Sequence, residues 1–253
     1  MRGCFPCRVR KAMGDSCNKC GGKKYRIDGK GEFARAVVCG CAGDCGDCGG
    51  RGFLIEKKDG YKSKVSCRSC SDMRDNVKKY NRAQIPAVMA GARVKGGSVT
   101  NNYIAAAQYV EGFITHYPER QGFVLCGSAG CGKSDLAALV VAELTLKQGV
   151  GCLFQDFGDL ILRLKDRSAG TSELVVLEPL FKIPLLVIDG VGSGGREITD
   201  WERNVLESIV SKRHGARAKT VITTKYGESE FKTHVGDRSF SRISAMCEFL
   251  GMD

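Results

Sequence analysis

The sequence predicts an α/β fold with a parallel sheet, preceded by a small cysteine-rich module. Three observations support this. Short apolar runs alternate with helical patterns after residue 99, a glycine-rich segment separates one such run from the next helix, and ten of the fourteen cysteines lie before residue 71. Strands that alternate with helices are typical of a parallel sheet covered on both faces.

The composition changes twice along the chain. At 253 residues the chain is long enough for one good-sized domain and one small one. Residues 1–72 are rich in Cys, Gly and Lys, and residues 73–98 are a basic stretch. We therefore expect a cysteine-rich zinc-binding module (1–72), a basic linker (73–98) and a nucleotide-binding α/β domain (99–253).

The positive charge is concentrated in the N-terminal part. Residues 1–95 carry 22 Lys+Arg against 9 Asp+Glu, and the remainder carries 17 against 19, so net charges of +13 and −2 make up the total of +11. This asymmetry favours a polyanionic partner, most simply nucleic acid, over a merely solvated basic surface. No apolar run approaches the roughly 20 residues of a membrane span, and residues 1–7 lack a signal-peptide core, so we expect a cytoplasmic protein without a membrane partner.

The expected strands and helices follow from hydrophobic periodicity. Helical spacing runs through residues 103–117, and Thr100 and Asn101 offer capping oxygens just before it. The other helical patterns cover 133–147, 157–164 and 200–213. Strand-like runs cover 123–126, 151–154, 185–188 and 220–223, with a weaker candidate at 246–250.

The strongest motif is a phosphate-binding loop. The segment 127–134 matches G-x-x-x-x-G-K-[ST] in full, and it lies between a predicted strand and a predicted helix. In such loops backbone N–H groups and the helix N-terminus bind phosphate oxygens. Lys133 is expected to reach the β- and γ-phosphates of ATP, and Ser134 to hold Mg²⁺. The predicted nucleotide-binding residues are Gly127, Ser128, Ala129, Gly130, Cys131, Gly132, Lys133, Ser134 and Asp135.

A second magnesium ligand is predicted at the end of another apolar strand. Residues 185–188 are all apolar and are followed by Asp189. In open α/β sheets ligands bind at the carboxyl ends of the strands, which places Asp189 opposite the phosphate-binding loop. The alternative is an ordinary turn residue at a strand end.

The cysteine spacing predicts two zinc sites. Eighteen residues separate Cys20 from Cys39, and eighteen also separate Cys48 from Cys67. Each interval contains β-prone residues around a Gly-containing turn, which is typical of a zinc ribbon that joins two cysteine pairs into a tetrahedral site. The predicted ligands are Cys17, Cys20, Cys39 and Cys41 in one site and Cys45, Cys48, Cys67 and Cys70 in the other. Their role should be structural, because four thiolates close the site.

Two questions about the cysteines stay open. Cys4 and Cys7 form a further pair that either replaces a ligand or is free, and an iron–sulfur cluster is the main alternative to zinc. The segment 45–52 also resembles a repeat of the DnaJ cysteine-rich region, but the His-Pro-Asp motif of a J-domain is missing from the sequence.

Taken together, these motifs resemble the AAA+ helicase-loader family of the DnaC/DnaI type and its transposition relative IstB. The cysteine module is followed by a connector at 82–86, the phosphate-binding loop, Asp189, a segment from Arg196 to Glu202, the strand 220–224 and a box at 236–243. The resemblance implies an AAA+ core with strand order 5-1-4-3-2. It also implies ATP, Mg²⁺ and two Zn²⁺ as cofactors.

The resemblance further implies a function. It predicts a loader of a replicative helicase onto single-stranded DNA, with ATP controlling assembly and self-association through the AAA+ core. Arg242 would act as an arginine finger on the ATP of a neighbouring subunit, with Arg238 as the alternative. In this family the N-terminal module binds the helicase. The positive charge of this module also makes contact with DNA phosphates a second possible role.

The chain departs from the family pattern at three points. Gly190 stands where an acid usually orients the attacking water, Lys225 stands at the sensor-1 position, and the chain stops at Asp253 where a sensor-2 arginine would follow. ATP binding is expected to survive these changes, whereas efficient hydrolysis is in question. Glu197 or Asp200 could replace the missing acid. Two alternative functions therefore stay open: an IstB-like transposition ATPase, and a nucleotide-binding adaptor with little hydrolysis.

Overall fold

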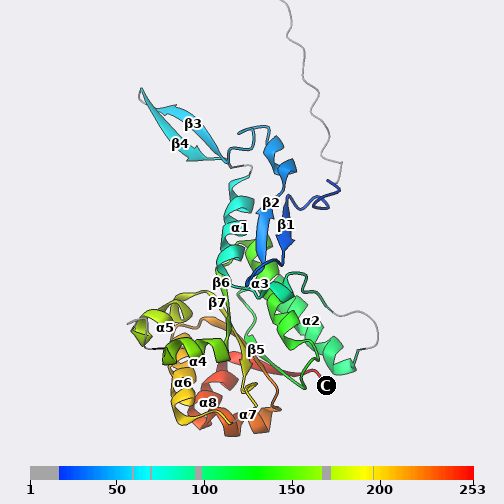
Figure 1. Cartoon of the computed structure of the whole chain (residues 1–253), viewed down its shortest axis with the longest axis vertical. Helices are drawn as coiled ribbons and strands as arrows, with labels where there is room; N and C mark the ends of the chain where they lie inside the picture. Colours follow the sequence, from blue (N-terminus) through cyan, green and yellow to red (C-terminus); the bar gives the residue numbers. More distant parts are fainter. Residues whose placement is uncertain (1–16, 59, 69, 95–98, 167–171, 196) are drawn as a thin grey trace, which may run out of the picture. The chain divides into compact units, whose positions relative to one another are not determined.

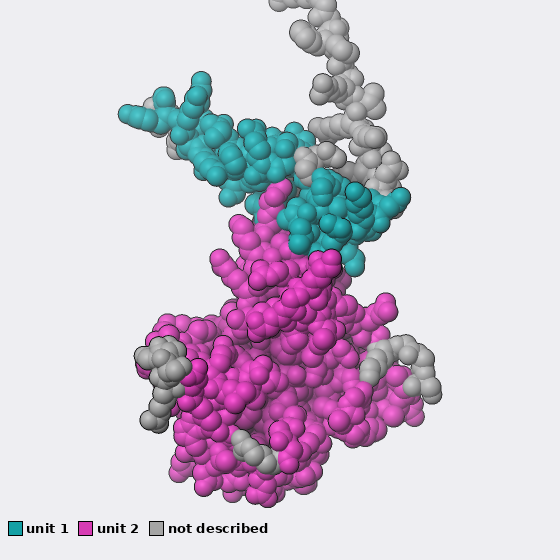
Figure 2. Space-filling model, viewed as in Figure 1, with its two compact units in different colours: residues 1–26, 37–71 teal, residues 27–36, 72–253 magenta. Residues whose placement is uncertain are grey.

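A computed structural model describes residues 17–253 except 59, 69, 95–98, 167–171 and 196. The chain forms two compact units (Figure 2): residues 1–26 with 37–71, and residues 27–36 with 72–253. Cys4, Cys7 and Arg196, which the sequence singled out, lie outside the described residues. The three-part division expected from composition stays a prediction.

The larger unit is built on a five-stranded parallel sheet (Figure 1) with the order β6-β7-β8-β5-β9. When the strands are numbered within this sheet alone and read from the other edge, the order is 5-1-4-3-2, so the predicted fold class is confirmed. β5 is buried at every position because helices cover both faces of the sheet. The strands are β5 (Gly122–Cys126), β6 (Cys152–Asp156), β7 (Leu185–Val191), β8 (Lys219–Thr224) and β9 (Cys247–Gly251).

Alternate side chains of the strands pack against helices on opposite faces of the sheet. On one face, Phe123 of β5 makes an edge contact with Phe113 of α2 (Asn101–Thr115), with ring centroids 5.2 Å apart. On the other face, Val124 and Ile222 belong to a core cluster with residues of the helices that follow β6, β7 and β8. The helices after residue 100 are α2 (Asn101–Thr115), α3 (Lys133–Gln148), α4 (Phe157–Lys165), α5 (Glu173–Lys182), α6 (Asp200–Gly215), α7 (Glu228–Val235) and α8 (Asp237–Met246).

Sequence periodicity located α2, α3, α4 and α6 but not α5, α7 and α8. Thr100 caps α2 as expected, because its hydroxyl accepts a hydrogen bond from the N–H of Tyr103 at 3.0 Å. After residue 100, the three helices that were missed have ten residues or fewer, and α5 contains Pro179. A short helix shows few turns of the 3.6-residue period, but length alone does not explain the difference, because α4 was located and has nine residues.

The basic stretch after residue 72 contains a helix that is fastened to the sheet domain. In α1 (Ser71–Arg82), Asn76 donates to the carbonyl of Leu146 at 3.1 Å, and Lys79 donates to the carbonyl of Gly149 at 2.5 Å. Both acceptors lie at the C-terminal end of α3, where carbonyls lack helical partners and a cation is favourable. A short 3-10 helix (Ala87–Met89) follows α1.

The smaller unit contains the cysteine clusters, the antiparallel hairpin of β3 (Phe53–Lys58) and β4 (Tyr61–Ser66), and the outer ends of two further short strands. These are β1 (Tyr25–Asp28) and β2 (Arg35–Val38), which pair with each other and whose residues 27–36 are counted with the larger unit. A 3-10 helix (Gly40–Asp44) follows β2. The side chains of β4 are largely exposed, and the buried cluster beside this hairpin consists of cysteines, so this unit has little apolar core to stabilise it.

Candidate functional site

The predicted phosphate-binding loop joins β5 to α3. Its backbone has left-handed φ values at Gly130 (+80°) and Gly132 (+105°), a region that other residues rarely adopt. α3 begins at Lys133, so the free N–H groups of its first turn face the loop. Within the loop Ser128, Ala129 and Gly130 are exposed, Gly127 and Gly132 are buried, and Cys131 and residues 133–135 are partly buried.

Lys133 is held by the carbonyls of its own loop. Its ammonium donates to the carbonyl of Gly127 at 2.8 Å and to that of Ser128 at 2.6 Å. The carboxylate of Asp253 contacts this loop from outside. It accepts hydrogen bonds from the N–H of Ser128 at 2.8 Å and from the hydroxyl of Ser128 at 2.6 Å. These hydrogen bonds lower the pKa of the Asp253 carboxyl.

The structure brings Ser134 and Asp189 together. The hydroxyl of Ser134 lies 2.8 and 3.0 Å from the two carboxylate oxygens of Asp189. Thr223 on β8 donates to the same carboxylate at 2.6 Å and accepts from the N–H of Gly190 at 2.8 Å. Asp189 is only 7% exposed, and burial raises its pKa against the opposing hydrogen bonds from Thr223 and Ser134. A buried carboxylate of this kind is stabilised by a cation beside it.

Two residues beside the phosphate-binding loop were not found from the sequence. A cavity of 330 Å³ is lined by Val88 and Met89 together with loop and α3 residues. Val88 is 90% exposed although it is apolar. No sequence signal marked these residues, because they lie in a segment that composition assigned to a linker. Thr223 was noted only as part of the strand 220–224.

The residues that depart from the family pattern have distinct surroundings. Gly190 has a left-handed φ of +74°. Lys225 is exposed, and its ammonium lies 5.1 Å from the ring centroid of Tyr226. Of the two proposed replacement acids, Asp200 has a 94% exposed side chain paired with Arg203, while Glu197 lines a 270 Å³ cavity with Gly190.

The two candidate arginine fingers lie one turn apart on α8. Arg238 is exposed. Arg242 is partly buried, and its guanidinium lies 3.2 Å from a carboxylate oxygen of Glu207 on α6. Whichever residue acts as a finger would be presented by α8, and Arg242 would first have to leave its partner.

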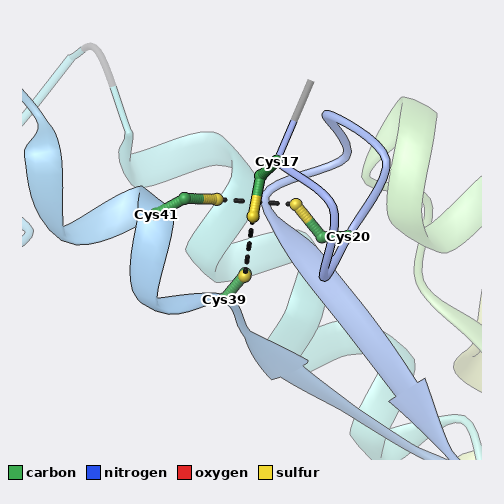
Figure 3. Close-up of side chains that lie close together, drawn as sticks. All are labelled: Cys17, Cys20, Cys39 and Cys41. Atoms are coloured by element: carbon green, nitrogen blue, oxygen red, sulfur yellow. Dashed lines mark hydrogen bonds between the residues drawn. The ribbon is translucent and has the colours of Figure 1, made fainter. Parts of the chain in front are cut away.

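The eight predicted zinc ligands form two clusters of four. In the first cluster, Cys17 and Cys39 are 3.9 Å apart at sulfur, and Cys20 and Cys41 are 3.4 Å apart (Figure 3). In the second, the sulfur of Cys45 lies 3.7 Å from that of Cys67, and Cys48 lies 3.6 Å from Cys70. Within each cluster all four ligand atoms lie within 4.8 Å of one another.

This geometry fits zinc. Four thiolates about 2.3 Å from a central Zn²⁺ would stand about 3.8 Å apart, close to the distances between these sulfurs. Burial opposes ionisation of Cys48, but the N–H of Gly52 at 3.2 Å and the neighbouring thiols outweigh it and lower the pKa of Cys48 to about 6. The thiolate is the form that binds metal. The two clusters can therefore hold one zinc ion each.

Among the described residues, no helix is both long enough and apolar enough to cross a membrane.

Comparison with known proteins places the sheet domain in a family. Residues 107–248, more than half of the chain, match the model of the IstB-like ATP binding proteins. The replicative helicase loader DnaC of Escherichia coli (strain K12) is 31% identical over 153 residues, which are 60% of this chain and 60% of the loader. This chain thus spans less than two thirds of the length of that relative.

Solved structures agree on the fold. The crystal structure of the DnaC helicase loader superposes with a TM-score of 0.58 at 26% identity, covering 66% of this chain and 99% of that one. The structure of DnaI gives a TM-score of 0.57 at 23% identity, covering 67% and 92%. DnaA from Aquifex aeolicus bound to AMPPCP gives 0.55 at 14% identity, covering 64% and 50%. The last two support the AAA+ fold alone.

Proposed function

This chain belongs to the family of IstB-like ATP-binding proteins, and on that premise we propose that it is an ATP-dependent loader of a replicative helicase onto single-stranded DNA. The similarity to the E. coli helicase loader supports this role. The observation that carries the proposal is the grouping of Lys133, Ser134 and Asp189 at one end of a parallel sheet. These residue types bind the phosphates and Mg²⁺ of ATP, which ATP-controlled assembly requires.

ATP binding would replace interactions that the loop now makes with itself. Lys133 would exchange the carbonyls of Gly127 and Ser128 for the β- and γ-phosphates, while the first turn of α3 donates N–H groups to the same phosphates. Val88 and Met89 offer an apolar surface next to the loop, which suits the face of the adenine base.

Ser134 and Asp189 would hold Mg²⁺. A hydroxyl and a carboxylate are the hard oxygen ligands that this ion prefers, and their proximity supports the assignment. When bound, the ion neutralises charge on the β- and γ-phosphates. Thr223 keeps the carboxylate in place through its 2.6 Å hydrogen bond.

The cysteine clusters would bind two structural zinc ions, and the module around them would contact the helicase. Single-stranded DNA has a separate candidate surface on the β3–β4 hairpin. The register places Lys57 directly opposite Lys62 and Ile55 opposite Lys64, so these residues share one face. Like charges directly opposite each other are unfavourable unless an anion lies beside them. The ammonium of Lys64 also lies 3.9 Å from the ring centroid of Phe53.

Self-association would complete the ATP site. Arg242 or Arg238 on α8 would reach the γ-phosphate of a neighbouring subunit. The ion pair with Glu207 would hold the side chain of Arg242 on its own subunit until a second subunit docks.

Two other functions have specific support. An IstB-like role in transposition follows from the family itself. An adaptor that binds ATP but hydrolyses little follows from Gly190 and Lys225, which stand where the related ATPases carry hydrolytic groups.

A loading assay tests the proposal. The replicative helicase from the same source would be mixed with this protein, ATP and forked DNA whose single strand is coated with binding protein, and unwinding would be measured. We expect unwinding that depends on this protein and is lost with Lys133→Ala. The variant Lys147→Ala, an exposed lysine on the same helix, is the matched control. Unwinding that is independent of the protein would exclude the loader role, and stimulation of a transposase instead would favour the IstB-like one.

A further inference from the structure

Residue 190 cannot carry the acid that the related ATPases place after the Mg²⁺-binding aspartate without strain. Its φ of +74° lies in the left-handed region, which a glutamate side chain disfavours. The pairing of β7 with β8 is irregular here, with a register shift between Ile188 and Val191. For ATP to be hydrolysed here, a carboxylate for the attacking water would therefore come from elsewhere in the fold.

The neighbouring strand supplies one. Asp156 is the last residue of β6 and pairs in register with Asp189 of β7, so both acids stand at the carboxyl edge of the sheet. The Oδ2 atom of Asp156 lies 3.6 Å from the position that a Cβ at residue 190 would occupy. A glutamate holds its own carboxylate oxygens roughly 3 to 3.6 Å from its Cβ, by ordinary bond lengths. Asp156 thus places an oxygen at the distance at which the missing side chain would have placed its own.

The Asp156 carboxylate is fixed in this position. Its Oδ1 atom caps α4 by accepting a 2.8 Å hydrogen bond from the N–H of Asp159. The cap anchors one oxygen and leaves Oδ2 on the side of Gly190. The rival acids are held less firmly, because the side chain of Asp200 is 94% exposed, and Glu197 is exposed although it lines one cavity together with Gly190.

We propose that Asp156 is the water-orienting residue of this ATPase and replaces the acid that Gly190 lacks. The inference rests on the proposed ATP-dependent function. Asp156 would accept a hydrogen bond from the attacking water. The water oxygen then bonds to the γ-phosphorus as the bond from that phosphorus to the bridging oxygen breaks. The proton lost by the water passes to a γ-phosphoryl oxygen, so the products are ADP and dihydrogen phosphate and Asp156 is unchanged.

The test is Asp156→Asn in the full chain. Asparagine caps helices as well as aspartate, so the variant removes the charge and keeps α4. Asp159→Asn in the same helical turn is the matched control, and Glu197→Gln tests the rival acid. Steady-state ATP hydrolysis with single-stranded DNA would be measured beside the affinity for a fluorescent ATP analogue. We expect turnover to fall about 100-fold in Asp156→Asn, while the affinity changes less than about twofold and Asp159→Asn behaves as wild type.

A binding readout separates orientation of water from other defects. ADP with aluminium fluoride mimics the transition state with its attacking water, whereas ADP with beryllium fluoride mimics bound ATP. Asp156→Asn should no longer retain ADP with aluminium fluoride, but it should still retain ADP with beryllium fluoride. Wild-type turnover in Asp156→Asn, with Lys133→Ala inactive, would overturn the inference and leave the proposed function intact, as would a loss confined to Glu197→Gln. A wild-type protein that binds ATP but never hydrolyses it would overturn both this inference and the proposal that the protein is an ATPase.

Discussion

The hydroxyl of Thr223 donates a 2.6 Å hydrogen bond to the carboxylate of Asp189. The hydroxyl oxygen of Thr223 in turn accepts a hydrogen bond from the N–H of Gly190 at 2.8 Å. One side chain on β8 thus satisfies two polar groups of β7 at the point where the candidate magnesium site lies. Thr223 and Asp189 are 34 residues apart in sequence, so their hydrogen bond ties β8 to β7.

Thr223→Val should weaken magnesium-dependent nucleotide binding and destabilise the fold. The isosteric methyl group leaves the partly buried N–H of Gly190 without its partner, which costs about 1 kcal/mol. Urea unfolding and a Mg²⁺ titration with a fluorescent ATP analogue would measure the two effects. Thr223→Ser keeps the hydroxyl and should restore both. Unchanged Mg²⁺ dependence in the valine variant would show that the hydrogen bond does not position Asp189.

The purified protein should contain two zinc ions, and Cys48→Ser should contain one. Each cluster closes its own tetrahedron, so loss of one ligand disables one site only. Native mass spectrometry counts the ions, and Cys152→Ala, which removes a buried cysteine outside both clusters, should keep two. Visible absorbance from iron and sulfide in place of zinc would contradict the prediction.

Arg213→Met should be among the most destabilising single substitutions in the sheet domain. Arg213 is fully buried, and its guanidinium donates to Thr220 and to the carbonyls of Leu180, Ile183, Pro184 and Lys219. Burial lowers its pKa to about 10, which still leaves it charged at neutral pH. Several carbonyls lose their donor at once, so we expect about 3 kcal/mol or more of lost stability in chemical denaturation. The exposed neighbour Lys212→Met is the control.

Asp253→Asn should tighten ATP binding severalfold. The carboxylate lies on Ser128 of the phosphate-binding loop and repels incoming phosphates, at a cost of about 1 kcal/mol for exposed charges. The gain, measured by titration with a fluorescent ATP analogue, should shrink as salt is added. Asp237→Asn removes an exposed charge on α8 and should have no effect. A weaker affinity in Asp253→Asn would mean that the carboxylate supports the loop instead.

Mixing two inactive variants tests whether the ATP site is shared between subunits. Arg242→Ala lacks the proposed finger, and Lys133→Ala lacks the phosphate-binding lysine. In a mixed assembly some sites would combine an intact loop with an intact finger, so part of the hydrolysis should return. Glu207→Gln, which releases Arg242 from its ion pair, should assemble more readily. Activity that never recovers in the mixture would place the site within one chain, whereas full activity of Arg242→Ala by itself would transfer the role to Arg238.

Much of this protein can be predicted from local sequence patterns. The loop at 127–134 is contiguous, so its residues could be recognised as a unit, and the equal intervals between cysteine pairs predicted the two groups of four that the structure brings together. The alternation of apolar runs with helical periods identified four strands and the weaker fifth. The resemblance then supplied their order, which the structure confirms.

Other features exist only in three dimensions. Asp156 is 33 residues from Asp189 in sequence, and only the parallel pairing of β6 with β7 makes them neighbours. Likewise, Lys79 in a stretch predicted as linker caps α3, because the carbonyl of Gly149 is left unpaired at the end of that helix. A periodic pattern reports which face of an element is buried. Which polar side chains meet across strands depends on register and backbone conformation, and the tertiary structure alone decides these.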